Sequence, residues 1–314
     1  MAQPLNDAAP IITVVGSFAV GLTMRASALP IFGETSFGTD FDMGPGGKGS
    51  NQAVGIARLG GDCALVGLIG EDALAKIATD LYAAEGVSTT HLGQTAMRAT
   101  GVGFIILNTK GENFILLDMG ANELMTAARV DEAEARIAKS GTVMAVLEIP
   151  LEAAMRAMIL GRKHGARTIL NPAPARVLPH TILPYIDYLT PNESELRILM
   201  GLAADDPAST ADLARGLRAQ GVGNVVVTLG ANGALILTDK MEEWVPPCKV
   251  PVVDTTGAGD AFNAGFAIAL GEGRDLVGAV KFANACGAIA CTKLGVVPSL
   301  ARRADAEELH DRTY

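Results

Sequence analysis

Short runs of apolar, often β-branched residues recur along the chain, and each is followed by a segment in which apolar residues repeat at helical spacing. Runs that are apolar at every position are typical of strands buried on both faces of a parallel sheet. Because strand and helix alternate, the pattern predicts an α/β fold with a doubly wound, mainly parallel sheet flanked by helices. The runs are residues 11–18, 63–70, 142–149, 166–173 and 224–230, and the helical segments are 51–59, 73–84, 130–139, 151–163, 193–200, 210–219, 261–270 and 276–291.

Two extended segments depart from this alternation. Residues 100–120 predict a hairpin turning at residues 109–113, and residues 22–43 are extended and interrupted by Pro30 and Gly33. We expect no helix directly after either segment, so together they predict a small β lid that projects from the main sheet. We expect residues 1–10 to be a disordered tail, and residues 11–314 to form a single α/β domain that carries the lid.

Charge and composition exclude several classes of function. A net charge of -9 disfavours a nucleic-acid partner. No apolar run reaches the roughly 18 residues that span a bilayer, and the first residues lack the pattern of a signal peptide. We therefore expect a cytoplasmic protein with no membrane partner. The cysteines lack Cys-x-x-Cys spacing, which indicates reduced thiols and no thiolate metal site; they are Cys63, Cys248, Cys286 and Cys291.

The stretch VVDTTGAGDAFNAGF places an aspartate, Asp260, directly after a turn that is poor in side chains. Around Gly257, Ala258 and Gly259 several backbone N–H groups can point at one anion, and the dipole of the following helix adds about half a positive charge. Asp260 is then placed to act as a general base beside an oxyanion or phosphoryl site. The residues alone leave an alternative equally open, in which Asp260 only caps the helix.

A second glycine-rich stretch, GPGGKGSNQAVGIARLGG, precedes an amphipathic helix. It places Gly47, Lys48 and Asn51 at the edge of the sheet where ligands of α/β proteins bind, and Lys48 and Asn51 could hydrogen-bond a polyol. The alternative is an ordinary loop in which Asn51 caps or starts the helix. Neither glycine cluster has the spacing of a P-loop or of a dinucleotide-binding G-x-G-x-x-G motif, because Gly49 follows Lys48 and no third glycine follows Gly259 at the required distance.

These motifs occur in an order that resembles the ribokinase branch of the PfkB sugar-kinase family, from about Ile11 to Ser299. GGKGSNQAV, from Gly46 to Val54, is similar to the N-terminal motif of that family, and DTTGAGDAFNAGF, from Asp254, is similar to its C-terminal motif. Between them stand NPAPAR, TPNESE and VTLGANGA in the family's order. The resemblance implies a ribokinase-like fold and the ATP-dependent phosphorylation of a hydroxyl of ribose or a related sugar or polyol.

The resemblance also implies a role for each matched position. Asp260 would be the catalytic base, beside an anion hole made by Gly257, Ala258 and Gly259. The lid would close over the sugar and form the contact of a homodimer, which would cover its strand edges. The other implied roles are sugar binding by Gly47, Lys48, Asn51 and Glu148; ATP binding by Asn192, Thr228, Gly230 and Asn284; Mg²⁺ binding through water by Glu195; and binding of an activating K⁺ by Asp254, Thr256, Ala290, Lys293, Gly295 and Ser299.

The resemblance fails directly after the first predicted strand. Ribokinases carry there an Asn and, two residues later, an Asp that grips the vicinal diol of ribose, whereas this chain has Ala19 and Gly21. A hydrogen bond to a charged group is worth about 1.5–3 kcal/mol, so loss of the Asp alone predicts roughly tenfold to a hundredfold weaker binding of ribose. Phe18, Met24 and Arg25 could reshape this side of the pocket. We therefore expect a substrate that lacks the ribose diol or presents it differently.

Two other functions remain open from the sequence. A nucleoside kinase of the same superfamily would need an apolar site for the base near the lid, for which Phe18 and Phe104 give weak support. A non-catalytic sugar- or nucleotide-binding regulator would keep the fold and lose the reaction. The intact turn from Gly257 to Asp260 argues against a regulator.

Overall fold

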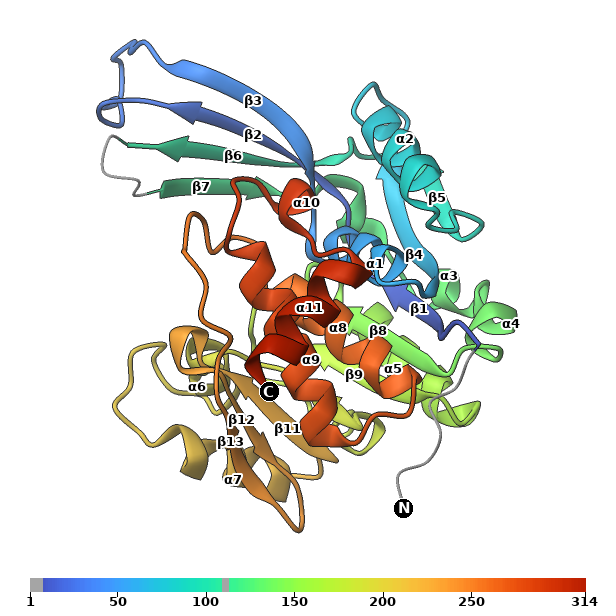
Figure 1. Ribbon diagram of the computed structural model, residues 1–314. Helices are drawn as coiled ribbons and strands as arrows, with labels where there is room; N and C mark the ends of the chain where they lie inside the picture. Colours follow the sequence, from blue (N-terminus) through green and yellow to red (C-terminus); the bar gives the residue numbers. More distant parts are fainter. Residues whose placement is uncertain (1–7, 109–112) are drawn as a thin grey trace.

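The computed structural model describes residues 8–108 and 113–314, which form a large sheet covered by helices and a smaller sheet that projects from one end (Figure 1). The strand order of the large sheet is β13-β12-β11-β10-β9-β8-β1-β4-β5. Neighbouring strands are parallel from β5 to β11, and only β12 and β13 at one edge are antiparallel. The strands are β1 (Ile11–Val15), β4 (Asp62–Gly70), β5 (Leu92–Thr95), β8 (Thr142–Val146), β9 (Arg167–Asn171), β10 (Tyr188–Leu189), β11 (Asn224–Thr228), β12 (Ala234–Leu237) and β13 (Glu242–Val245).

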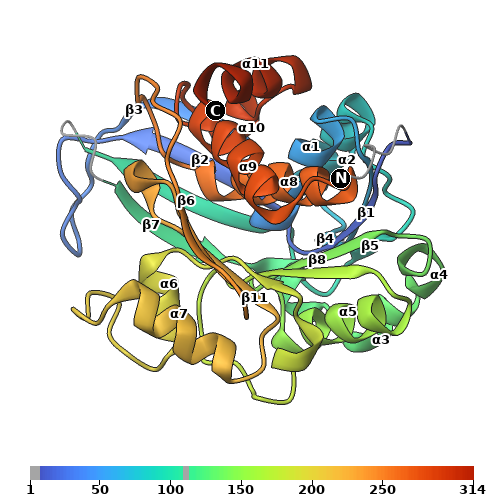
Figure 2. The same cartoon turned by 60° about the horizontal axis from the view of Figure 1, so that its bottom comes forward.

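Helices cover both faces of the large sheet (Figure 2). The face of the N-terminal and C-terminal helices carries α1 (Lys48–Arg58), α2 (Ala75–Glu85), α8 (Ala258–Gly271), α9 (Leu276–Ala290), α10 (Val296–Ser299) and α11 (Arg303–Thr313). The opposite face carries α3 (Ala127–Asp131), α4 (Glu134–Ile137), α5 (Leu151–Lys163), α6 (Glu193–Leu199) and α7 (Thr210–Ala219). Short 3-10 helices lie at Gly120–Leu124, Leu183–Tyr185 and Gly230–Asn232.

Each central strand supplies apolar side chains to both helix layers. In β1, Ile12 and Val14 belong to the hydrophobic core shared with α1, α8 and α9, whereas Val15 belongs to the core shared with α3 and α5. In β8, Met144 lies in the first core, and its neighbour Val143 lies in the second. Burial on both sides explains why these strands are continuously apolar in sequence. The predicted doubly wound α/β fold is therefore present.

The small sheet has the strand order β3-β2-β6-β7 and stands at the top left of Figure 1. Its strands are β2 (Ala19–Arg25), β3 (Thr39–Gly46), β6 (Gly101–Leu107) and β7 (Asn113–Asp118). They include the two segments predicted to leave the main sheet, although residues 109–112 of the predicted turn lie outside the described residues. The expectation that no helix follows was wrong for residues 22–43, because β3 leads through Gly47 directly into α1.

Several elements differ from the sequence prediction. The helix expected over residues 130–139 is two short helices, α3 and α4, and β5, β10, β12, β13 and α11 were not predicted. Of the expected tail, residues 1–7 lie outside the described part of the chain, and the carbonyl of Pro10 accepts a hydrogen bond from the Asp62 N–H at 2.9 Å. No helix in the described residues is long and apolar enough to cross a membrane.

Candidate active site

The carboxyl ends of the parallel strands and the N-termini of three helices meet at one edge of the large sheet. β9 ends at Asn171 and β11 at Thr228 on this edge, and Ser17 and Glu148 follow β1 and β8. Helices α1, α6 and α8 begin here. In open α/β sheets this edge is where ligands bind.

Asp260 lies in the first turn of α8, and α1 holds its carboxylate from the side. Asn51 Nδ2 donates to Oδ2 at 2.8 Å, and Gln52 Nε2 donates to Oδ1 at 3.2 Å. The side chain is buried, with 4% of its surface exposed. No side chain among the described residues caps α8, so Asp260 does not cap its own helix. Asn51 lies inside α1, which begins at Lys48, so it does not cap or start that helix either.

The turn before Asp260 packs against α10 at Gly257 and has open space beside Gly259. Gly257 has φ 81°, a left-handed conformation, and a Cβ atom there would lie 2.4 Å from Cγ1 of Val296 in α10. A Cβ atom on Gly259 would meet no heavy atom within 4 Å. The Cβ side of Gly259 is therefore open, while Val296 of α10 packs behind Gly257. The first N–H groups of α8 have no side-chain cap among the described residues and are available to an anion.

A group of opposite charges surrounds the start of α1. Glu148 Oε2 accepts hydrogen bonds from the Lys48 N–H at 2.7 Å and from Ser17 Oγ at 2.5 Å. Burial raises the pKa of Glu148 despite these two donors and the Lys48 charge. Burial lowers the pKa of Lys48, but Asp260, Glu148 and Glu195 outweigh that effect and leave it raised. The Lys48 ammonium therefore lies in the field of three carboxylates.

Asn192 and Glu195 form a capping box at the N-terminus of α6. Glu195 N–H donates to Asn192 Oδ1, and Asn192 N–H donates to Glu195 Oε2, both at 2.8 Å. Thr228, at the end of β11, pairs with Asn192 through an isolated parallel bridge. Burial raises the pKa of Glu195; the Asn192 hydrogen bond and Lys48 lower it, and the charge of Asp260 adds to the rise. Glu195 thus stabilises its helix and also lies within electrostatic reach of Asp260 and Lys48.

Asp254 joins the two loops predicted to hold a monovalent cation. Its Oδ1 accepts from the Thr256 N–H at 2.9 Å and from Thr256 Oγ1 at 2.7 Å, and its Oδ2 accepts from the Gly295 N–H at 3.3 Å. Ser299 Oγ donates to the carbonyl of Val296, the residue behind Gly257. The chain from Ala290 through Lys293 to Ser299 therefore lies beside the loop that leads into α8.

Asn284 lies in α9, and Gly230 lies in the short 3-10 helix that follows β11. Asn284 Nδ2 donates to the carbonyl of Pro246 at 3.0 Å and to Tyr314 Oη at 3.3 Å. One turn later on α9, a Cβ atom on Gly287 would lie 3.2 Å from the Ala258 carbonyl, so α9 links Asn284 to the turn before Asp260. Gly230 has φ 55° and opens the short helix after β11.

The small sheet presents few polar groups where the family pattern has an Asn and an Asp. Ala19 pairs with Gly46 and Gly101, and Gly21 pairs with Gly44 and Gly103; these positions share one face of the sheet.

Of the residues expected to reshape the pocket, Phe18 is 1% exposed and packs edge-on against the ring of Tyr82. It is therefore not open to a nucleoside base. Met24 and Arg25 lie at the far end of β2, and Arg25 is about 20 Å from Ala19 along an extended strand. Phe18 therefore packs into the core, and Arg25 lies well away from Ala19 along β2.

Sequence reasoning missed a set of buried polar residues that surround Asp260. They lie on α1, after β1, at the ends of β9 and β10, and in α8. Four of them lie inside the quoted motifs, Gln52 in GGKGSNQAV, Asn171 in NPAPAR, Thr190 in TPNESE and Asn263 in DTTGAGDAFNAGF, which is the indication that the sequence offers. The set is Ser17, Gln52, Asn171, Thr190 and Asn263.

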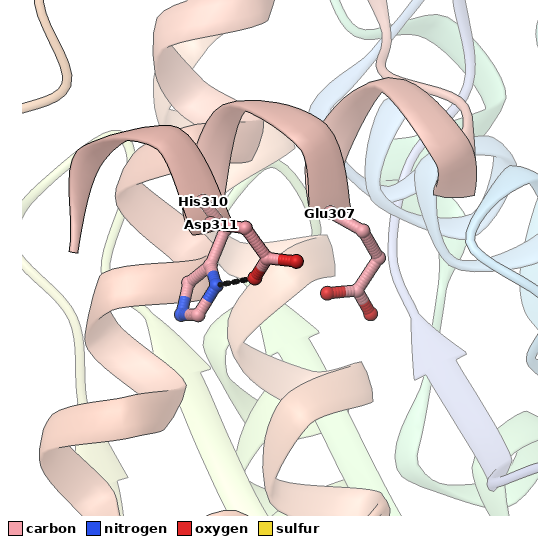
Figure 3. A group of neighbouring side chains, drawn as sticks. All are labelled: Glu307, His310 and Asp311. Carbon is pink, nitrogen blue, oxygen red and sulfur yellow. Dashed lines mark hydrogen bonds and ion pairs between the residues drawn. The ribbon is translucent and has the colours of Figure 1, made fainter.

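One further cluster of potential metal ligands lies on α11 (Figure 3). Ligand atoms of Glu307, His310 and Asp311 lie within 4.8 Å of one another. Glu307 Oε1, however, is paired with Arg274 and Arg303, both at 2.7 Å. Two guanidinium groups at this distance oppose the binding of a cation, and we assign no metal to this cluster.

Comparisons with known proteins agree with the motifs. The model of the pfkB family carbohydrate kinases matches residues 10–302. Ribokinase of Haemophilus influenzae is 36% identical over 297 residues, which cover 95% of this chain and 97% of that protein. Deoxyribokinase of Salmonella typhi is 36% identical over 289 residues, which cover 92% and 94%.

Solved structures give the same result. Ribokinase from Thermotoga maritima superposes with a TM-score of 0.88 at 32% identity, over 96% of this chain and 99% of that one. Arabidopsis thaliana ribokinase, solved in complex with ribose and ATP, also has a TM-score of 0.88, at 30% identity over 96% and 99%. The predicted fold class and family are confirmed. The chain belongs to the pfkB family of carbohydrate kinases, as a ribokinase-like enzyme that uses ATP to phosphorylate a sugar.

Proposed function

We propose that Asp260 takes the proton from the sugar hydroxyl while the N-terminus of α8 holds the γ-phosphoryl group of ATP. The observation that carries this proposal is the position of a buried, doubly hydrogen-bonded carboxylate in the first turn of a helix with no side-chain cap. Phosphoryl transfer depends mainly on positioning and charge neutralisation, and both groups sit on one rigid turn.

The reaction then proceeds as an in-line transfer. The sugar oxygen forms a bond to the γ-phosphorus, the bond between that phosphorus and the β–γ bridging oxygen breaks, and the hydroxyl proton passes to Asp260. The N–H groups of Gly257, Ala258 and Gly259 stabilise the negative charge on the transferred group. Asp260 acts as a general base, so its carboxylate must be ionised when the sugar binds.

The sugar is expected to lie between α1 and the small sheet. Gly47, Lys48, Asn51 and Glu148 would contact its hydroxyls. Glu148 Oε2 is occupied by Ser17 and Lys48, whereas Oε1 accepts no hydrogen bond from the described residues. That oxygen is the natural acceptor for a sugar hydroxyl. For ATP, we propose contacts from Asn192, Thr228 and Gly230 near the phosphates and from Asn284 near the adenine.

Two cations fit the residues present. Glu195 offers a carboxylate oxygen, the donor type that Mg²⁺ prefers, close to the proposed phosphate position. Asp254 and neighbouring backbone carbonyls offer an all-oxygen set suited to K⁺, beside the turn of Gly257. When bound, Mg²⁺ would neutralise phosphate charge and K⁺ would stiffen the anion hole. The proposed K⁺ set is Asp254, Thr256, Ala290, Lys293, Gly295 and Ser299.

The specificity for the sugar depends on two polar side chains that the small sheet lacks. With Ala19 and Gly21 in place of a diol-binding pair, we propose a sugar or polyol that lacks the ribose diol or presents it differently. We propose further that residues 22–43 and 100–120 act as a lid over the sugar and form a homodimer contact. All four cysteines are free, as suits a reducing compartment, and we propose that the enzyme works in the cytoplasm.

Asp260→Asn tests the assignment of the base. Asn keeps the shape but cannot accept the proton, so kcat should fall by about 10² to 10⁴, while the KM for ATP changes little. The assay is ADP release with Mg-ATP, with and without K⁺, across pentoses, hexoses, polyols and nucleosides. Asp80→Asn is the control, because it makes the same change in an exposed pair with Lys76. A variant at Asp260 that keeps more than a tenth of the wild-type kcat would remove Asp260 from the mechanism.

A further inference from the structure

Gln52 is completely buried and lies against the proposed base. Its Nε2 donates to Asp260 Oδ1 at 3.2 Å and to Asn171 Oδ1 at 3.0 Å. None of its side chain is exposed. A buried amide with this pair of acceptors is held in one orientation, because rotating it would place its oxygen against two other oxygens.

The contact belongs to a closed ring of hydrogen bonds. From Gln52 the ring passes to Asn171, whose Nδ2 donates to the Thr190 carbonyl at 3.2 Å. Thr190 Oγ1 donates to Asn263 Oδ1 at 2.6 Å, and Asn263 Nδ2 donates to the Gly259 carbonyl at 2.8 Å. Gly259 is bonded to Asp260, which closes the ring.

The orientation of each amide in the ring follows from a neighbouring group that only accepts hydrogen bonds: the Asp260 carboxylate for Gln52, the Thr190 carbonyl for Asn171 and the Gly259 carbonyl for Asn263. An ionised carboxylate only accepts hydrogen bonds, so Gln52 must present its NH₂ group. Gln52 therefore donates also to Asn171, and the Asn171 amide must face Thr190 with its nitrogen. The ring joins α1, the ends of β9 and β10, and the first turn of α8, all of them at the carboxyl edge of the sheet.

We propose that Gln52 is a positioning residue that fixes the orientation of the Asp260 carboxylate relative to the anion-hole turn. Asn51 holds the other oxygen, Oδ2, so the two neighbouring amides of α1 prevent the carboxylate from rotating about its bond to Cβ. Lys48, Glu148 and Glu195 also face Asp260, but through charge and without hydrogen bonds to it. This inference rests on the proposed role of Asp260 as the base.

Gln52→Met tests the proposal, because methionine has a similar length and no donor. We expect kcat to fall about 10- to 100-fold, the range for losing one hydrogen bond to a charged group, with both KM values within about threefold of wild type. Thr13→Val is the control. Thr13 lies in β1, and its side chain forms a buried hydrogen bond with Ser140. The substitution removes this bond and should lower stability without changing kcat.

A double-mutant cycle with Asp260→Asn separates positioning from a general structural effect. If Gln52 acts through the carboxylate, Gln52→Met should change the residual rate of Asp260→Asn by less than about threefold. Equal factors in both backgrounds, or a Gln52→Met enzyme with wild-type kcat, would overturn the proposal. An active Asp260→Asn enzyme would instead reject the proposed base. If Gln52→Met does not fold, Gln52→Leu serves in the same cycle with the same expected factors, since it also lacks the donor and is uncharged.

Discussion

Gly21 is the residue at which a single side chain would most change the proposed sugar pocket. It lies in β2 between Gly44 and Gly103, and a Cβ atom there would approach other atoms no closer than 3.7 Å, an ordinary contact. Its φ is not in the left-handed region, so a larger residue adds no backbone strain. Steric hindrance therefore does not explain why this chain lacks an acidic residue at position 21.

Gly21→Asp should shift the enzyme toward ribose. A carboxylate at this position could bind a vicinal diol, so the ratio of kcat/KM for ribose to that for 2-deoxyribose should rise about tenfold to a hundredfold. Thr39→Asp adds the same charge at the exposed far end of the small sheet and should leave the ratio unchanged. A folded Gly21→Asp enzyme with the wild-type ratio would show that this position does not contact the diol.

At the scale of single residues, the sequence motifs located many residues of the candidate site but not the hydrogen bonds between them. Asn51 and Asp260 were assigned to separate roles, yet they bond directly. Gln52 was not selected at all, because its contact with Asp260 spans 208 positions and leaves no local pattern. Ser17 was missed for the same reason, since its partner Glu148 lies 131 positions away.

The first turn of α8 is the element on which the proposed chemistry depends. Gly257 must adopt a left-handed φ and must also lack a Cβ, because Val296 fills the space behind it. α10 therefore sets the position of the turn by direct contact. Any residue with a side chain at 257 has to displace either α10 or the N–H groups of the proposed anion hole.

Gly257→Ala should damage both stability and catalysis. The left-handed conformation alone costs about 1–2 kcal/mol for a residue with a Cβ, and the contact with Val296 adds to this cost. Displacement of the turn should lower kcat at least tenfold. Gly86→Ala is the matched control: Gly86 ends α2 with φ 74° and has no atom within 4 Å of the added Cβ. The Gly86→Ala variant should be less stable than the wild type but should keep its kcat. Equal activities of the two variants would show that the turn tolerates displacement.

The boundaries of the elements explain where the sequence prediction succeeded and where it did not. α5 and α7 occupy the predicted residues, because their apolar positions alone define them. α1 and α8 each begin three residues earlier than predicted, because their first turns contain glycines that local propensity places in loops. α11 was missed because charged residues dominate it, and ion pairs such as Arg274 with Glu307 attach it to the rest of the fold.

At the scale of the whole molecule, one face of the small sheet remains apolar and exposed. Phe104 is 51% exposed and is paired with Leu22 and Leu116, so these three side chains share a face. Met24 and Phe114 extend this face outward and are also exposed. An apolar surface on a projecting sheet favours the proposed contact with a second copy of the chain, which would bury it.

Phe104→Asp should prevent that contact. A charge at the centre of the exposed face costs several kcal/mol if it is buried unpaired, so the variant should sediment as a monomer where the wild type sediments as a dimer. Met97→Asp, at a residue 80% exposed and outside the sheet, is the control and should keep the wild-type mass. A wild type that is monomeric at micromolar concentration would reject the homodimer.

The attachment of Asp260 to the same helical turn as Gly257, Ala258 and Gly259 has a consequence for how such enzymes diversify. If the proposed roles hold, the group that activates the acceptor and the turn that receives the phosphoryl group cannot move apart by substitution elsewhere, since no more than three peptide bonds separate Asp260 from Gly257. The proposed sugar-facing wall belongs to different strands, and Gly21 in it has space for a side chain. New substrates can therefore be acquired by changing that wall, while the chemical step is inherited intact.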